Sequence, residues 1–291
     1  MRVKISIMTI PPIFLTACTL CLLALNSLLA SSRASQSNFA SSQLLAIATK
    51  EEQIYQRLSE DPEFYSATDL ERQLQTLIAS YKAYLLKQAA DVDGWILYGK
   101  LLRRVHANDA AFNAFLKADQ LDPALAVVKQ QIGTHLAESG RGKAALPFYI
   151  QATELEPETA IYHFALGQLL DGFKVEFVEQ AVFSIDAIDR EMLKAFRQAV
   201  ALEPENINFQ MRLGETYYDL DQPDWPAAQR HWDQLNKRID EPWQRQIIDL
   251  HRARVLAKLG QIEAAERLLD GIQHPSLQDS RQKVLNQLNS L

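Results

Sequence analysis

The sequence predicts an all-α fold, a solenoid of stacked helix–turn–helix units that follows a separate N-terminal segment. Three observations predict it. A 34-residue period runs through the middle of the chain, apolar residues recur at helical spacing within each period, and proline or glycine marks the ends of the expected helices. The 291 residues are 47% hydrophobic and 23% charged, which is typical of a folded protein with a substantial core.

Residues 1–34 are expected to form a signal peptide or an N-terminal membrane anchor. Arg2 and Lys4 precede an apolar run, whose unbroken part spans residues 13–30 and is followed by small residues. This layout is typical of a secretory signal, and 18 apolar residues also approach the length of a spanning helix. The basic start predicts that the bulk of the chain is exported to a periplasmic or extracytoplasmic location. There the chain would either be cleaved from this segment or stay anchored to the membrane by it.

The same segment contains a third possible targeting signal. Residues 15–18, Leu-Thr-Ala-Cys, resemble the lipobox of bacterial lipoproteins, in which Cys18 would be the lipidated residue. Residues 19–30 stay apolar, however, where such proteins usually continue with a polar tether. The second cysteine, Cys21, also lies here, so the rest of the chain can hold neither a disulfide, nor a cysteine-ligated zinc ion, nor a thiol nucleophile.

The charge of the chain limits its partners. The formal charge is −6, and it becomes −9 without residues 1–34, because that segment holds three basic and no acidic residues. An acidic body argues against nucleic-acid binding, which needs a basic surface. It also argues against attraction to anionic lipid, so membrane contact is expected only through the N-terminal segment.

The 34-residue period is visible at small residues and at proline. Gly99, Gly133 and Gly167 are each 34 residues apart, and Pro123 and Pro157 keep the same separation. Each period is expected to form two helices that expose an apolar face until they stack on the next pair. Gly99 and Ala111 are small where the two helices would approach closely. The bulky Trp95 and Phe115 are expected to fill the space between neighbouring pairs.

These residues resemble the tetratricopeptide repeat (TPR) family, whose pattern is a Trp, Leu-Gly, a Tyr, a small Ala, an aromatic residue, a second Ala and a closing Pro. Residues 92–125 carry Trp95, Tyr98-Gly99, Leu102, Ala111, Phe115, Ala118 and Pro123. Residues 126–159 carry Ile132-Gly133, Leu136, Gly140, Ala145, Tyr149, Ala152 and Pro157, but have Lys129 in place of the Trp. The resemblance implies a right-handed superhelical solenoid that binds proteins or peptides.

The remaining segments depart further from the repeat pattern. Residues 35–91 are expected to hold two helices, over 44–58 and 70–88, that form a degenerate first pair. Residues 92–204 are expected to hold three repeats, the third with 13 extra residues near 171–186. Residues 205–275 are expected to form two degenerate repeats, and residues 276–291 an amphipathic capping helix.

The resemblance implies a concave groove lined by the first helix of every pair. The residues at the inward phases of these helices are Ile96, Lys100, Arg103, Gln130, Thr134, Phe164, Gln168, Met211, Glu215, Tyr218, Leu250 and Arg254. Family members that grip a C-terminal carboxylate use a Lys and Asn pair in the first such helix. Ile96 and Lys100 occupy those phases here, which argues against that clamp.

The insertion near 171–186 is apolar for a loop. Phe173, Phe177 and Phe183 need cover, and two interpretations remain open. They pack locally as an extension of the core, or they form part of a binding surface, because insertions in repeats often lie on one face.

The chain carries no recognisable catalytic motif. Its six histidines are scattered without metal-ligand spacing, and the glycine-rich nucleotide-binding and nucleophile-elbow patterns are absent from the sequence. No catalytic residue, cofactor or metal site is therefore predicted. The expected function is a non-enzymatic scaffold or adaptor of the cell envelope that holds a protein or peptide segment. The alternative is an accessory subunit of an envelope enzyme or of a secretion or polymer-export assembly.

Overall fold

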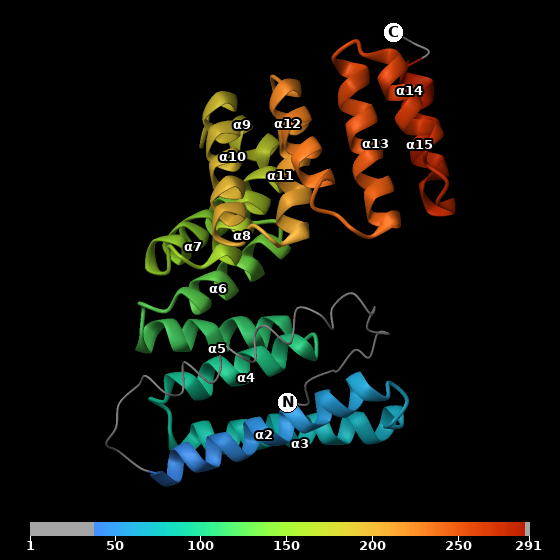
Figure 1. Ribbon diagram of the computed structural model, residues 1–291. Coiled ribbons are helices and arrows are strands. Elements are labelled where there is room, and N and C mark those ends of the chain that lie inside the picture. Colours follow the sequence, from blue (N-terminus) through green and yellow to red (C-terminus); the bar gives the residue numbers. More distant parts are fainter. Residues whose placement is uncertain (1–37, 289–291) are drawn as a thin grey trace. The chain divides into compact units, whose positions relative to one another are not determined.

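In the computed structural model, which describes residues 38–288, the chain forms fourteen α-helices and one short 3-10 helix, and no strand occurs among these residues (Figure 1). The predicted N-terminal segment, with Cys18, lies outside the described residues. The chain divides into two compact units, one ending at Ser139 and the other beginning at Gly140. Each is described by itself.

The first unit is a series of helices in which each packs on the next. They are α2 (Asn38–Glu60), α3 (Ala67–Lys87), α4 (Val92–Arg104), α5 (Asn108–Leu121) and α6 (Ala126–Glu138). Two begin at a side-chain cap: Ser66 accepts a hydrogen bond from the backbone of Asp69 before α3, and Asp91 accepts from the backbone of Asp93 before α4. The pairs α2–α3 and α4–α5 are antiparallel helical hairpins, as Figure 1 shows.

The second unit, taken by itself, is also a series of packed helices. Its helices are α7 (Gly142–Leu155), α8 (Ala160–Gly172), α9 (Lys174–Glu179), α10 (Ile185–Leu202), α11 (Ile207–Asp219), α12 (Trp225–Asn236), α13 (Pro242–Lys258), α14 (Ile262–Asp270) and α15 (Gln278–Leu288). The hairpins are α8–α10, α11–α12 and α13–α14, and each contacts the next. The predicted fold class, an all-α solenoid of stacked TPR-like helix pairs, is confirmed within each unit.

A glycine on the first helix faces an aromatic ring on the second in three of these hairpins. A Cβ atom added to Gly99 would lie 2.8 Å from the ring of Phe115, one on Gly167 would lie 2.8 Å from Phe196, and one on Gly214 would lie 2.3 Å from Trp232. These separations are closer than real Cβ atoms approach, so only glycine permits the packing. The prediction that Gly99 allows close approach is confirmed.

The placement of Phe115 differs from the prediction. Its ring fills the space within its own hairpin, against Gly99, because the absence of a side chain there leaves a recess that a bulky ring occupies. Trp95 stays partly exposed and donates its indole N–H to the backbone oxygen of Ala89, at 2.9 Å. The polar edge of the indole thus holds this ring at the start of α4.

The C-terminal end of the second unit is closed by α15. Val284 and Leu288 on this helix are buried in one apolar cluster with Leu250, Ala253 and Leu269, which belong to α13 and α14. Gln282 and Lys283 on its other side are exposed. A helix with one apolar and one polar face is suited to ending a stack of repeats.

Candidate functional site

The candidate site lies in the second unit, on a polar stripe of α11. Asn206 caps this helix by accepting a hydrogen bond from the backbone of Phe209. The apolar positions of the helix turn toward the core, whereas Met211, Glu215 and Tyr218, spaced i, i+4 and i+7, stay half-buried on the same side. The stripe is therefore held at the surface by the burial of the opposite face.

Residues from α8 contact α11 beside this stripe. The Arg212 guanidinium lies 2.7 Å from a carboxylate oxygen of Asp171 on α8 and 2.7 Å from one of Asp219 on its own helix. The ring of Phe164 stacks on Phe209, with centroids 4.5 Å apart. The ion pairs and the ring contact together fix α8 beside α11.

Residues from α13 contact the other side of the stripe. The Tyr218 hydroxyl lies 2.7 Å from Nδ1 of His251, and Nε2 of the same ring lies 4.0 Å from the Glu215 carboxylate. His251 also stacks on the buried Trp232, with centroids 4.3 Å apart. The guanidinium of Arg254, one turn further along α13, lies 5.9 Å from the centre of the Tyr218 ring. We call the surface carrying Gln168, Asp171, Met211, Glu215, Tyr218 and Arg254 the α8–α11–α13 face.

Burial and neighbouring charges shift the protonation of this face. Burial raises the pKa of Glu215, and the nearby Asp219 adds to this while Arg212 opposes it. Burial lowers the pKa of His251 to about 4, and the charge of Arg254 acts in the same direction. His251 is therefore neutral at pH 7, and its unprotonated Nδ1 can accept the proton of the Tyr218 hydroxyl.

The face brings together most of the groove residues predicted for the second unit. Glu215, Tyr218 and Arg254 converge, and Met211 and Gln168 lie on the same face. Phe164 is turned mainly toward the core. Leu250 does not line the surface, because it is 6% exposed and belongs to the apolar cluster under α14 and α15.

In the first unit the predicted groove positions are largely occupied by internal contacts. Arg103 forms an ion pair with Glu138 at 2.7 Å. Ile96 is 7% exposed and part of the core, which corrects its placement as a lining residue; the apolar side chain is covered where α4 packs. Lys100, Gln130 and Thr134 are half-buried.

A buried ion pair occupies the end of α4. Glu51 of α2 accepts hydrogen bonds from the Tyr81 hydroxyl and from the Arg104 guanidinium, each at 2.9 Å, and Arg104 lies over the ring of Tyr55. Burial raises the pKa of Glu51, while the charge of Arg104 opposes that rise. This cluster joins α2, α3 and α4. Its basic residue, Arg104, directly follows the predicted groove residue Arg103 in the sequence.

Sequence reasoning missed several residues of the α8–α11–α13 face. His251 was counted among scattered histidines, and its partner Tyr218 lies 33 residues away, so no local spacing relates them. Arg212 follows Met211 and lies one position off the predicted inward phase. A signal was present at Arg212, because Asp219 lies seven residues later, two turns along the same side of the helix.

The structure buries one aromatic residue of the insertion in the core and leaves the rest half-buried or exposed. Phe177, on α9, is 0% exposed, so its side chain is not a surface residue. Phe173 and Phe183 are half-buried and lie 6.0 and 5.9 Å from the Phe177 ring, centre to centre. Lys174 on α9 forms an ion pair with Asp189 of α10 at 2.5 Å, which fixes the short helix against α10.

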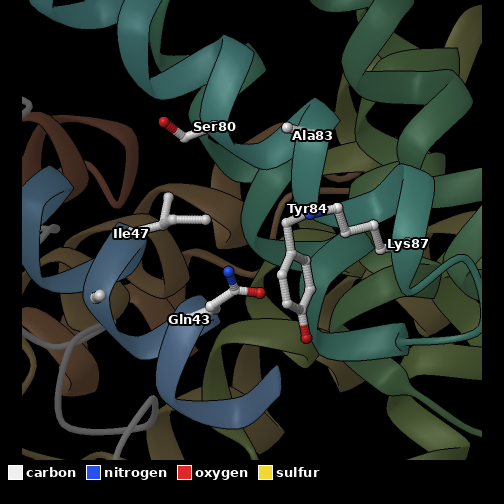
Figure 2. Close-up of a pocket in the computed structure, with 7 residues that line it drawn as sticks. Gln43, Ile47, Ser80, Ala83, Tyr84 and Lys87 are labelled. Atoms are coloured by element: carbon white, nitrogen blue, oxygen red, sulfur yellow. The ribbon is translucent and has the colours of Figure 1, made fainter. Parts of the chain in front are cut away.

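A small hollow between α2 and α3 is a weaker candidate site. It has a volume of about 280 Å³ and is lined by Gln43 and Ile47 of α2 and by Tyr84 and Lys87 of α3; Figure 2 shows Gln43 beside the Tyr84 ring. This volume is below the range typical of small-molecule sites. The Tyr84 hydroxyl in its lining is already bonded to Asp91.

Residues 38–288 contain neither a cluster of metal-ligating side chains nor a helix suited to cross a membrane. No group of three or more His, Cys, Asp or Glu side chains within residues 38–288 is placed to hold a metal ion. Across the same residues, none of the helices combines the length and the apolar character that crossing a membrane requires.

Comparisons with known proteins identify the fold. No family model matches the chain, and no curated protein matches it. Solved structures do match. YrrB, described as a TPR protein with an unusual peptide-binding site, has a TM-score of 0.56 and 17% identity, over 71% of this chain and 96% of that one. The chain has a TPR-like fold.

Two other solved structures agree with this assignment. PilW, described as a widely conserved type IV pilus biogenesis factor, has a TM-score of 0.54 and 14% identity, over 86% of this chain and 100% of that one. MamA from Desulfovibrio magneticus RS-1, from residue 41 to its end, has a TM-score of 0.50 and 20% identity, over 71% of this chain and 100% of that one. Identities this low establish a shared fold only.

Proposed function

We propose that this chain is a non-enzymatic scaffold or adaptor that binds a protein or peptide segment on the α8–α11–α13 face. The observation that carries the proposal is the convergence of Glu215, Tyr218 and Arg254 from two neighbouring helices. Tyr218 is held in place by His251, and that ring in turn is stacked on Trp232. Polar groups with fixed positions on a rigid face are suited to recognition.

The similarity to YrrB supports this proposal, since that protein is described by its peptide-binding site. The similarity to PilW, a pilus biogenesis factor, favours a second candidate function, an accessory subunit of an envelope assembly. In both cases the chain contributes binding and not catalysis.

Site-specific photo-crosslinking in cells tests the binding face. A photoreactive residue replaces Gln168, which is exposed on the α8–α11–α13 face, or Gln198, which is exposed on α10. We expect discrete crosslinked protein adducts from position 168 and none of the same mass from position 198. Identical adduct patterns from both positions, or none from either in a folded protein, would contradict the proposal.

We also propose that the chain acts in the cell envelope, exported or anchored by residues 1–34. Intact mass measurement of the protein from membrane and soluble fractions tests this. Cleavage after Ala34, which with Ser32 supplies the two small residues that a signal peptidase reads, a retained N-terminus in the membrane fraction, or a lipid mass at Cys18 distinguishes the three alternatives. An unmodified full-length chain in the cytosolic fraction would overturn export.

A further inference from the structure

The hollow between α2 and α3 has the size of one aromatic side chain. Its lining includes Ala46 and Ile47 of α2 and Ser80 and Ala83 of α3, and the two alanines are exposed. A cavity of about 150 Å³ is enough for a benzene molecule. The hollow, with a volume of about 280 Å³, can therefore take a phenyl ring.

An exposed phenyl ring lies at the other end of the same hairpin. Phe64, in the loop between α2 and α3, is 47% exposed. The loop is fixed by Asp61, whose backbone oxygen accepts from the N–H of Phe64 at 3.1 Å and whose carboxylate accepts from the N–H of Glu63 at 3.0 Å. The Arg57 guanidinium lies over the ring, 4.8 Å from its centre. The ring is thus held in place before any partner binds, which reduces the entropy that binding costs.

The ring and the hollow lie on the same side of α2. Gln43 and Ile47 line the hollow, and Arg57 holds Phe64. Ile47 and Arg57 follow Gln43 by 4 and 14 residues, which is close to one and four helical turns, so the three share one stripe of the helix. Fourteen residues also correspond to about 21 Å along the axis. The ring therefore cannot fill the hollow of its own chain, and only a second molecule can bring the two together.

The charges beside the ring and beside the hollow are opposite. Lys87 lines the hollow, and residues 79–90 around it contain two lysines and no acidic residue. Residues 52–72, at the other end of the hairpin, contain six acidic and two basic residues, and Glu63 directly precedes Phe64. A ring that enters the hollow of another copy therefore brings an acidic loop to a basic rim, which favours association.

We infer that the chain forms a symmetric dimer in which Phe64 of each copy inserts into the α2–α3 hollow of the other copy. Each copy carries both the ring and the hollow, so a two-fold axis makes the same contact twice. The two hairpins are then antiparallel, and Glu63 of each copy lies near Lys87 of the other. This interface belongs to the first unit and is independent of the α8–α11–α13 face.

Photo-crosslinking tests where the contact is made. A photoreactive phenylalanine analogue replaces Phe64 in the full-length protein, which is kept in solution by a mild detergent. We expect a crosslinked dimer on a denaturing gel, with the crosslink in residues 43–47 or 80–87. The matched control is position 175, because Val175 is 70% exposed on α9, and it should give no dimer. A dimer crosslinked at any other segment, or no dimer from position 64, would contradict the inference.

A variant without the ring tests its contribution. Phe64→Ser should weaken dimerisation about tenfold or more, because both ring contacts of the dimer are lost. Light scattering over a series of protein concentrations measures the change. Val175→Ser removes an exposed apolar side chain elsewhere and should leave dimerisation unchanged. Circular dichroism shows whether both variants are folded.

Charge reversal tests the pairing of the two ends. Lys87→Glu and Glu63→Lys should each weaken the dimer, since like charges then meet at both contacts. An equimolar mixture of these two variants should recover association, because each contact of the mixed dimer joins unlike charges. The matched control is Lys82→Glu, since Lys82 is exposed on α3 but does not line the hollow, and it should leave dimerisation unchanged.

Three results would overturn the inference. They are a wild-type chain that stays monomeric at every concentration, a dimer that Phe64→Ser leaves intact, and a mixture of the two charge-reversed variants that associates no better than either alone. None of them bears on the α8–α11–α13 face, because its own crosslinking test uses position 168 in the second unit.

Discussion

At Gly214 a hydrogen atom in place of a methyl group lets the Trp232 ring lie against the backbone of α11. A Cβ atom there would lie 2.3 Å from the ring, and the fully buried indole has no free space into which it can move. We expect Gly214→Ala to lower the free energy of unfolding by about 1–3 kcal/mol through overpacking, measured by denaturant titration.

The matched control for this substitution is Gly172→Ala. Gly172 is exposed at the end of α8, and an added Cβ atom would meet nothing within 4 Å. The change in unfolding free energy should stay within about 0.5 kcal/mol. Equal destabilisation by the two variants would show that the glycine–aromatic contact is not what requires glycine at position 214.

His251 makes stability depend on pH. Its pKa is about 4 in the folded chain and 6.5 in an unfolded one, so the folded state binds fewer protons between these values. Stability should therefore fall as the pH falls from about 6.5 to about 4, by on the order of 3 kcal/mol. The variant His251→Gln should flatten this dependence, measured by urea unfolding at pH 7 and at pH 4.5.

Another histidine contributes to the same pH range. Burial also lowers the pKa of His231, so part of the dependence should persist in His251→Gln and become smaller in the double variant with His231→Gln. A single variant whose pH profile overlays that of the wild type would contradict the assignment to His251.

Residues whose role depends on repeat phase could be predicted from the sequence, and those whose role depends on a partner helix could not. The position of Gly99 opposite the second helix followed from the 34-residue period. The pairing of His251 with Tyr218 did not, because burial and a stacked indole determine it and neither has a local sequence pattern.

At the scale of elements, α9 is the part of the insertion that the core requires. Phe177 is fully buried between the flanking aromatic residues, whereas Val175 on the same short helix is 70% exposed. We expect Phe177→Ser to lower the free energy of unfolding by about 3–5 kcal/mol, since it leaves a cavity and buries a hydroxyl. Thermal unfolding followed by circular dichroism measures the loss.

Val175→Ser provides the control on the same helix and should change the melting temperature little. If Phe177→Ser melted like the wild type, the insertion would be peripheral to the fold, and its aromatic residues would again be candidates for a binding surface.

The buried ion pair of Glu51 holds three helices together. Arg104→Met leaves the Glu51 carboxylate without its cation, in a site where burial already disfavours the charged form of this side chain. We expect a loss of about 2 kcal/mol of stability, less than for a fully buried pair because the Arg104 side chain is 29% exposed. The same substitution at Arg72, whose ion pair with Asp69 is on the surface, should cost no more than about 0.5 kcal/mol.

Helix positions were predictable where apolar spacing was regular, as it is over α4 and α5. The insertion was ambiguous because its apolar residues suit a core or a surface equally, and only the contacts of Phe177 decide between them. The hydrogen-bonded ion pair of Arg104 and Glu51 joins residues 53 positions apart, so it was not predictable from either helix alone.

At the scale of the whole molecule, contacts are local along the chain. Within each unit, a helix contacts mainly its hairpin partner and then the adjacent helix of the next hairpin, so stability is close to a sum of neighbouring contributions. We expect Gly214→Ala to raise amide hydrogen exchange most in α10–α13, with α2–α4 unchanged. A uniform rise across both units would show that the chain unfolds as a single cooperative body.

The fold class could be predicted because the period of the sequence is also the period of the structure. The binding face could be predicted only in part. The family phases gave Glu215, Tyr218 and Arg254, but not the ion pairs of Arg212 with Asp171 and Asp219. Which charged side chains remain available to bind a ligand depends on the contacts made in the folded unit.

The insertion leaves the hairpin of α8 and α10 unchanged. Gly167 meets Phe196 across 29 residues as Gly99 meets Phe115 across 16, so the 13 extra residues are absorbed entirely at one end of the pair. This end of the hairpin is thus a position where the chain tolerates the insertion of extra residues. At the exposed turn of Gln180 and Ala181 a reporter domain joined by flexible linkers should be accommodated with little cost, since the entropy of closing a loop grows slowly with its length.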